Sequence, residues 1–354
     1  MASVLVAMSG GVDSSVAACL LAEAGHEVLG SHMKLVHTDG VEHGCCGPQA
    51  EADARAVAEH AGFAFEVADL SDVFEERVIA DYVSEHQLGR TPNPCVRCNE
   101  RIKFGAFLDR ARSLGFDLVA TGHYARRVRG ENGRWRLLRG IDRAKDQSYM
   151  LHTLGQEELE RSLFPIGEQT KGETRAHARR LGLPVAGKPD SQELCFVPRA
   201  DGGAFLEERA PHLVREGEVV DPDGRVLGAH AGAHRFTIGQ RRGLGVSTGE
   251  RSYVVDVDPA ANRVVVGPGE LLARRGLVAE SVTWVLEPPS GPVEAEVQIR
   301  YNADAVPAIV EPLPGDAAHI TFRAPQRAIA PGQSAVFYAG DEVLGGGTIA
   351  RALR

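Results

Sequence analysis

The chain has 354 residues, of which 43% are hydrophobic and 25% charged, a composition typical of globular proteins. No apolar run approaches the roughly 18 residues of a membrane-spanning helix, and no basic segment precedes the apolar N-terminal run. We therefore expect a cytoplasmic protein of two or three domains, without a membrane partner. The net charge of −9 is unfavourable for binding a polyanion, because phosphates attract cations.

The N-terminal part has the pattern of a parallel α/β domain. Residues 3–8 form a short apolar run typical of a buried strand, residues 14–24 suit a helix, and residues 27–33 suit a second strand. This order predicts a doubly wound parallel sheet. Further elements are expected as helices at 48–61, 73–85 and 104–114 and as a strand at 117–120. The domain is expected to span residues 1–205.

Beyond residue 205 the pattern changes to short strands. Residues 206–275 alternate β-branched runs with turns, which predicts a small central β-rich domain. Residues 276–354 carry period-two runs separated by Gly and Pro, which predict a C-terminal β-barrel. The expected fold class is therefore α/β, a doubly wound parallel sheet followed by two small β domains, the last barrel-like.

A glycine- and serine-rich segment, AMSGGVDSS, lies between the first strand and the first helix. Its glycines let the backbone approach an anion, and a helix N-terminus presents unpaired N–H groups and a positive dipole end. The segment has neither the Gly-Lys-Ser/Thr ending of a Walker A loop nor the GxGxxG of a dinucleotide site. It is a candidate phosphate loop, in which Asp13 either braces the loop or acts through Mg²⁺.

Two cysteine motifs lie far apart in the chain. Cys95 and Cys98 form a CxxC with basic neighbours, and Cys195 stands in DSQELCF. Nearby cations lower the pKa of a thiol, and the thiolate is both nucleophile and sulfur carrier. A persulfide on one cysteine needs a second thiol to release its sulfur, which leaves a disulfide. Cysteines from two distant segments therefore fit a sulfur-transfer enzyme, whereas Cys19 is expected in the core and the Cys45–Cys46 pair has no assigned role.

Basic residues gather in three stretches despite the acidic total. The stretches are 126–145 with eight Lys or Arg, 171–188 with five, and 235–251 with four. Solvated surfaces are the plain explanation for one such stretch. Three of them in an acidic protein favour a surface for a polyanion, and we expect the first stretch to help bind RNA.

The order of the motifs carries a family resemblance. SGGVDSS, TPNPCVRCN, TGHYAR, KDQSYML, DSQELCF, RFTIGQRRGLG and IRYN follow one another between residues 7 and 302, and PGQSAVFY extends the pattern to about residue 338. The chain resembles the tRNA-specific 2-thiouridylases of the PP-loop ATP pyrophosphatase superfamily. The resemblance implies that ATP adenylates O2 of the wobble uridine of tRNA, and that a persulfide sulfur then displaces AMP. It also implies tRNA and a persulfide donor, such as a cysteine desulfurase or sulfur relay protein, as partners.

The resemblance assigns roles by position. Cys98 matches the nucleophilic cysteine and Cys195 the persulfide cysteine. The positions matching ATP contacts are Ala7, Met8, Ser9, Gly10, Gly11, Val12, Asp13, Ser14, Met33 and Gly122. The positions matching RNA contacts, of which the first three face the target base, are Asn93, Pro94, Cys95, His123, Lys145, Asp146, Gln147, Arg300, Tyr301 and Gln333.

One departure from the family pattern leaves the mechanism open. Many members have Asp where this chain has Cys95, and three thiolates, from Cys95, Cys98 and Cys195, could hold a [4Fe–4S] cluster with one open iron. The persulfide route and the cluster route are therefore both considered, and a structural zinc is a third use of the thiolates. Two other functions remain as alternatives, an amidating PP-loop ligase and a non-catalytic RNA-binding or iron–sulfur protein.

Overall fold

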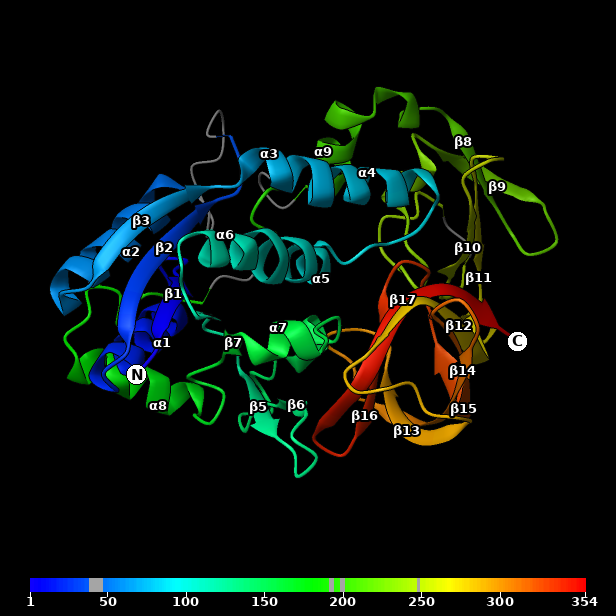
Figure 1. Cartoon of the computed structure of the whole chain (residues 1–354). Coiled ribbons are helices and arrows are strands. Elements are labelled where there is room, and N and C mark those ends of the chain that lie inside the picture. The colour runs from blue at the N-terminus through cyan, green and yellow to red at the C-terminus, as the bar shows by residue number, and fades with distance from the viewer. Residues whose placement is uncertain (38–46, 191–193, 198–200, 247–248) are drawn as a thin grey trace.

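The structure is a computed structural model, and it describes residues 1–37, 47–190, 194–197, 201–246 and 249–354. Cys45 and Cys46 lie outside the described residues. Figure 1 shows three parts in chain order: an α/β part, a small β unit and a barrel that ends at the C-terminus. Within the described part of the chain, no helix is long and apolar enough to cross a membrane.

The α/β part is built on a five-stranded parallel sheet. Its strands are β1 (Ser3–Ala7), β2 (Glu27–Lys34), β3 (Ala64–Asp69), β4 (Leu118–Ala120) and β7 (Ser162–Leu163), in the order β3-β2-β1-β4-β7. This confirms the predicted doubly wound sheet. The alternation along β1 divides the core, because side chains of successive residues point to opposite faces. Val4 and Val6 belong to one hydrophobic cluster, and Leu5 and Ala7 to another.

Helices cover both faces of this sheet (Figure 1). The first cluster contains side chains of α1 (Val12–Glu23), α2 (Pro48–Ala61) and α8 (Lys171–Arg180). The second contains side chains of the continuous helix formed by α5 (Pro94–Cys98), the π-helical η2 (Asn99–Ala106) and α6 (Phe107–Ser113). A long helix made of α3 (Ser71–Phe74), η1 (Glu75–Ile79) and α4 (Ala80–Gln87) runs toward the β domains.

The central unit and the barrel are both β structures, as predicted. After α9 (Gly202–Arg209), the central sheet has the order β10-β11-β8-β9, with β8 (Gly217–Val220), β9 (Val226–His230), β10 (Tyr253–Asp258) and β11 (Arg263–Gly267). The barrel strands are β12 (Ala273–Trp284), β13 (Val293–Gln298), β14 (Val306–Leu313), β15 (Ala317–Arg327), β16 (Ser334–Ala339) and β17 (Glu342–Leu353). Because β12 pairs with both β15 and β17, these six strands close on themselves.

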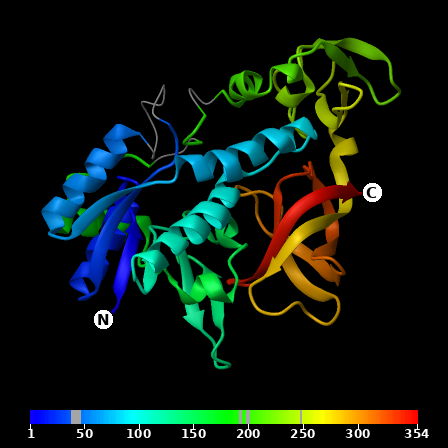
Figure 2. The ribbon, with the colours of Figure 1, turned by 45° about the horizontal axis from the view of Figure 1, so that its top comes forward.

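A hairpin of the α/β part joins the barrel to it. The strands β5 (Ala125–Arg129) and β6 (Trp135–Arg139) pair with each other, and β6 pairs with β17. The second hydrophobic cluster also runs across this boundary, since Val96 and Tyr149 share it with Val336 and Tyr338. The barrel is therefore packed directly against the segment that carries the CxxC motif, as Figure 2 also shows from a second direction.

The basic stretch 126–145 holds this junction together. All eight of its cationic side chains have partners inside the protein. Arg126 and Arg143 contact Asp341, Arg134 contacts Glu287, Arg136 contacts Glu342, Arg139 contacts Asp146, Lys145 contacts Asp190, and Arg127 and Arg129 lie over the Trp135 ring. Six of these cations contact a carboxylate, and two of the six share Asp341, so the stretch is only partly neutralised and its binding of RNA remains a prediction.

Candidate active site

The carboxyl ends of three adjacent strands meet at one edge of the parallel sheet, the usual place for ligands in open α/β folds. The loop Met8–Gly11 follows β1, Met33 lies at the end of β2, and Gly122 follows β4. The structure thus brings together the residues that the sequence assigns to ATP.

The loop after β1 forms a backbone cradle. Gly10 has φ +66°, and a Cβ atom there would lie 2.2 Å from the carbonyl oxygen of Ala50, so only glycine fits. No side chain caps the N-terminus of α1 at Gly11, which leaves backbone N–H groups for a ligand. The hydroxyl of Ser14 accepts a hydrogen bond from the N–H of Ser9 at 3.1 Å and fixes the loop. These residues fit the phosphates of ATP, which need N–H donors at a helix N-terminus.

Gly122 closes the cradle from the side of β4. A Cβ atom at this position would lie 2.5 Å from the backbone nitrogen of Ser14, inside contact distance. We predict that Gly122→Ala pushes the loop out of place and weakens ATP binding by roughly 10- to 100-fold. Binding of ATP by calorimetry measures this, with Gly291→Ala as the control, because a Cβ at Gly291 meets no atom within 4 Å. Equal ATP affinity of the two variants would show that the cradle does not hold the nucleotide.

Asp13 braces the loop in this structure. Its carboxylate accepts a hydrogen bond from the Tyr124 hydroxyl at 2.9 Å and contacts the Lys171 ammonium at 2.8 Å through both oxygens. Of the two roles considered for Asp13, bracing is therefore the one that the contacts provide. Gln147, a predicted RNA contact, supports the same arrangement, since its side-chain oxygen accepts from the N–H of Tyr124 at 3.0 Å.

Three residues near the loop are missing from the sequence-based site. Lys171 contacts Asp13 and Asp190, and Lys188 donates to the carbonyl of Gly10 at 3.0 Å. Burial opposes ionisation of Asp190, but hydrogen bonds from Lys145 and Lys171 outweigh it and lower its pKa to about 2. The sequence does contain a signal for Lys171. The capping box TKGE places Lys171 at the first position of a helix, where the positive end of the macrodipole is unfavourable for a cation.

The two predicted catalytic cysteines pack against one hydrophobic cluster. Cys98, at the end of α5, is buried and belongs to the cluster, whereas Cys195, in the short described segment 194–197, is half-buried and packs against it. Met33, from the end of β2, packs against the same cluster. Burial limits the access of water to the Cys98 thiol, which suits sulfur exchange.

Cys95 lies on the exposed side of the same short helix, facing the barrel. Asn93 caps this helix by accepting from the N–H of Cys95 at 3.1 Å, and Pro94 occupies its first turn. Burial raises the pKa of Tyr301, and Asp146 and the Cys95 thiol act in the same direction. Tyr301 of the barrel is thus an electrostatic neighbour of Cys95.

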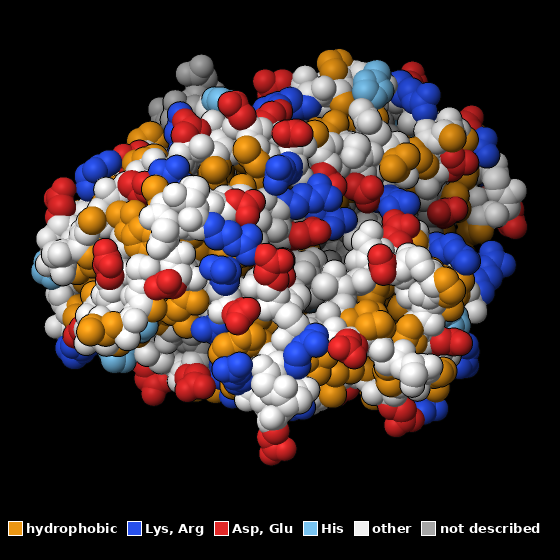
Figure 3. All heavy atoms as spheres, in the orientation of Figure 1, with side chains coloured by type: hydrophobic (Ala, Val, Ile, Leu, Met, Phe, Trp, Pro, Cys, Tyr) orange, Lys and Arg blue, Asp and Glu red, His pale blue; other side chains and the backbone are white. Residues whose placement is uncertain are grey.

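Residues of the barrel form hydrogen bonds to the segment that leads into this helix. The side-chain amide of Gln333 donates to the carbonyl oxygen of Thr91 at 2.7 Å, and the N–H of Thr91 donates to Pro331 at 2.8 Å. Arg97 also donates to the Thr348 hydroxyl of β17 at 3.1 Å. Figure 3 shows Lys and Arg side chains gathered among acidic ones where α4 and α5 meet the barrel.

The remaining predicted RNA contacts differ in exposure. Arg300 is exposed, and its guanidinium donates to the carbonyl of Arg327 at 2.7 Å. His123 is only 7% exposed and packs against the rings of Phe104 and Phe164, and burial holds its pKa well below the ordinary value. Asp146 is a turn-forming residue, accepting from the N–H groups of Gly140 and Ser148. These two side chains hold the fold at the site, and their contact with RNA remains a prediction.

The thiolates do not form a metal site in this arrangement. Among the described residues, which include Cys95, Cys98 and Cys195, no group of three or more His, Cys, Asp or Glu side chains is placed to hold a metal ion. Cys95 and Cys98 differ in exposure, one facing outward and the other buried in the core. A [4Fe–4S] cluster bound by the three thiolates stays a prediction, which the iron content of the protein tests.

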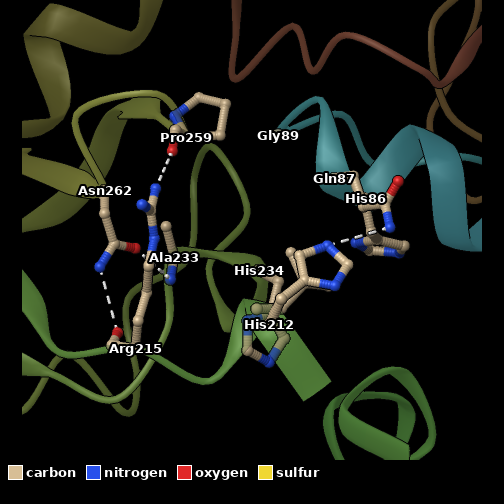
Figure 4. Close-up of a pocket in the computed structure, with 10 residues that line it drawn as sticks. His86, Gln87, Gly89, His212, Arg215, Ala233, His234, Pro259 and Asn262 are labelled. Atoms are coloured by element: carbon tan, nitrogen blue, oxygen red, sulfur yellow. Dashed lines mark hydrogen bonds between the residues drawn. The ribbon is translucent and has the colours of Figure 1, made fainter. Parts of the chain in front are cut away.

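A cavity of about 390 Å³ lies elsewhere, between the end of α4 and the central β unit (Figure 4). In it, the Gln87 amide lies 3.2 Å from Nε2 of His212, and Arg215 donates to the carbonyl of Pro259 at 2.6 Å. None of the predicted site residues lines this cavity. The positions predicted to contact ATP lie instead at the carboxyl ends of the parallel strands.

Comparison with known proteins agrees with this division of the chain. A family model described as tRNA methyl transferase HUP domain matches residues 2–199. A model described as tRNA methyl transferase PRC-barrel domain matches residues 203–268, and one described as Aminomethyltransferase beta-barrel domain matches residues 274–349. Fold and loop together define an α/β protein of the HUP class with two appended β domains.

Curated relatives give the family. A protein named tRNA-specific 2-thiouridylase MnmA from Acidothermus cellulolyticus is 50% identical, covering 99% of this chain and 98% of that protein. Proteins of the same name from Geobacter metallireducens and Carboxydothermus hydrogenoformans are 51% and 49% identical, each covering 99% of this chain and 97% and 98% of theirs. The chain belongs to the tRNA-specific 2-thiouridylase family.

Proposed function

We propose that this protein catalyses ATP-dependent 2-thiolation of uridine at the wobble position of tRNA. The proposal is supported by the packing of Cys195 and Met33 against the hydrophobic cluster that contains Cys98, with Met33 at the end of β2, the strand next to the one that the phosphate loop follows. A phosphate loop alone would suit many ATP-using ligases. Two cysteines from distant segments are needed by sulfur transfer and have no use in an amidating ligase.

The first step activates a poor leaving group. The carbonyl O2 of uridine attacks the α-phosphorus of ATP, an O2–phosphorus bond forms, and the bond to pyrophosphate breaks with its electron pair going to pyrophosphate. The N3 proton of the base is lost to solvent. The chain contributes the N–H groups at the start of α1 and the cations behind the loop, which offset the negative charge of the phosphates. Mg²⁺ would be held mainly by the phosphates of ATP, since this ion is usually bound by few protein ligands.

The second step transfers sulfur. A persulfide on Cys195 attacks C2 of the adenylated base and AMP leaves, so the sulfur links C2 to Cys195. The Cys98 thiolate then attacks the Cys195 sulfur, which releases 2-thiouridine and leaves a Cys98–Cys195 disulfide. A persulfide donor protein supplies each new sulfur atom, and a thiol reductant restores the two cysteines.

The test of this proposal is the dependence of AMP formation on tRNA. The proposed enzyme releases one AMP and one pyrophosphate per thiolated tRNA, and it needs a persulfide donor for turnover. An amidating ligase would instead consume ammonia and would not require Cys98 or Cys195. A non-catalytic RNA-binding protein would release no AMP at all.

Binding of tRNA is expected to depend on exposed cations of the β domains. Arg241, Arg242 and Arg300 are exposed cations of the β domains. We predict that Arg241→Ala with Arg242→Ala lowers tRNA affinity and reduces the slope of log K against log salt by about 1 for each cation that contacts phosphate. Arg134→Ala, which removes a cation paired with Glu287, is the control and is expected to change little. Filter binding across a salt series would contradict the prediction if both variants behaved alike.

A further inference from the structure

The charged side chains behind the phosphate loop form one connected cluster. The Lys171 ammonium lies 2.8 Å from Asp13 and 2.7 Å from Asp190. Asp190 is also contacted by Lys145 at 2.8 Å and by Arg175 at 2.9 Å. A third carboxylate, Asp142, accepts a hydrogen bond from the N–H of Lys171 at 2.9 Å, so three cations and three carboxylates are connected behind the cradle.

The position of Lys171 is electrostatically unfavourable for a cation. It is the first residue of α8, where the macrodipole is positive, and its side chain is only 12% exposed. Burying a cation is unfavourable unless it is paired, and here two carboxylates from distant parts of the chain provide the pairing. Asp13 is itself held by the Tyr124 hydroxyl, so the ammonium is directed to the first turn of α1.

We propose that Lys171 is a pyrophosphate-binding residue of the adenylation step. This assignment rests on the proposed function, since it concerns the leaving group of that reaction. When the bond between the α-phosphorus and the bridging oxygen breaks, its electron pair passes to the pyrophosphate. The Lys171 ammonium offsets this charge, and Asp13 and Asp190 hold the ammonium beside the loop before ATP arrives.

The same contacts explain why an aspartate stands in a phosphate loop. A lone carboxylate in the first turn of α1 would repel the phosphates. With Lys171 between Asp13 and Asp190, the carboxylate positions a cation for the phosphates, and the two remaining cations on Asp190 keep that residue neutralised when Lys171 turns to the ligand.

Binding of inorganic pyrophosphate and of AMP, each followed by calorimetry without tRNA, tests the assignment. Lys171→Met keeps the length of the side chain and removes its charge, and we expect pyrophosphate to bind about 10- to 100-fold more weakly. AMP, which lacks the β- and γ-phosphates, is expected to bind within about twofold of the unmodified protein. Lys171→Arg keeps the cation and is expected to recover most of the pyrophosphate affinity.

The control is Arg180→Met on the same helix, where the guanidinium forms a surface pair with Glu23 at 2.8 Å. Unchanged pyrophosphate affinity in Lys171→Met would overturn the assignment. An equal loss of AMP and pyrophosphate binding would overturn it too, because it would reveal a purely structural role. A protein that binds pyrophosphate through Lys171 but forms no AMP with tRNA would leave the assignment standing and refute the proposed function instead.

Discussion

Serine in place of Cys98 or of Cys195 is expected to lower 2-thiouridine formation by at least about 1,000-fold, because a hydroxyl carries no sulfur and resolves no persulfide. Both variants should still release one pyrophosphate per bound tRNA in a single turnover, since adenylation precedes sulfur transfer. AMP, which leaves only when the Cys195 persulfide attacks C2, should be released by Cys98→Ser but not by Cys195→Ser. Quantifying pyrophosphate, AMP and 2-thiouridine in the same reaction separates the steps. The outcome distinguishes a sulfur carrier from a residue that only supports the fold.

Cys19→Ala is the matched control for the cysteine variants. Cys19 lies in the core of α1, and burial raises the pKa of its thiol to about 11, so it does not act as a thiolate near neutral pH. Its removal is expected to leave both AMP and 2-thiouridine formation unchanged. Thiolation at the normal rate by Cys98→Ser or Cys195→Ser would refute the assigned chemistry.

Removing the charge of Asp13 is the second change with a large expected effect. Asp13→Asn keeps the size of the side chain but loses the ionic contacts with Lys171, and we expect ATP consumption to fall about 100-fold or more. Ser14→Ala removes the hydroxyl that fixes Ser9 and should act in the same direction. Release of AMP in the presence of tRNA is the measurement.

Asp72→Asn is the control for Asp13→Asn. Asp72 also lies in the first turn of a helix, α3, but its side chain is 96% exposed. Its loss is expected to leave ATP consumption unchanged. Equal turnover of Asp13→Asn and the unmodified protein would show that the loop does not handle the phosphates.

Most of the fold follows from local patterns in the sequence. The strand β1 is apolar and buried on both faces from Val4 to Ala7, and the helix predicted at 48–61 has the observed bounds of α2. The helix predicted at 104–114 was too short, because the observed helix begins at Pro94. Asn93 as N-cap followed by proline is the signature of that start, and it places Cys95 and Cys98 on a helix.

Contacts between distant segments were not predictable in the same way. Two arginines of the β5–β6 hairpin contact Asp341 and Glu342, which lie on or beside β17, far along the chain. The ion pairs of Asp190 with Lys145 and Lys171 likewise form only in the folded protein and have no local pattern in the sequence. The loop Met8–Gly11 was predictable because its residues are consecutive in the sequence, whereas the cations behind it come from distant segments.

Cys95 gives a further means of separating the two sulfur routes. In the persulfide route Cys95→Asp is expected to retain activity, because Cys95 is exposed at the barrel while Cys98 and Cys195 share the buried cluster. In the cluster route the same change replaces a soft sulfur ligand by oxygen and weakens iron binding. Activity and iron content of this variant must therefore be measured together.

The most direct test of the whole account is anaerobic thiolation of unmodified tRNA by the purified protein with ATP and a persulfide donor. Nucleoside mass spectrometry measures the product, and iron, AMP and pyrophosphate are quantified in the same samples. The account predicts 2-thiouridine at the wobble position, with one AMP and one pyrophosphate for each, from protein that contains no iron. Absence of 2-thiouridine under these conditions, or its formation only by iron-loaded protein, would contradict it.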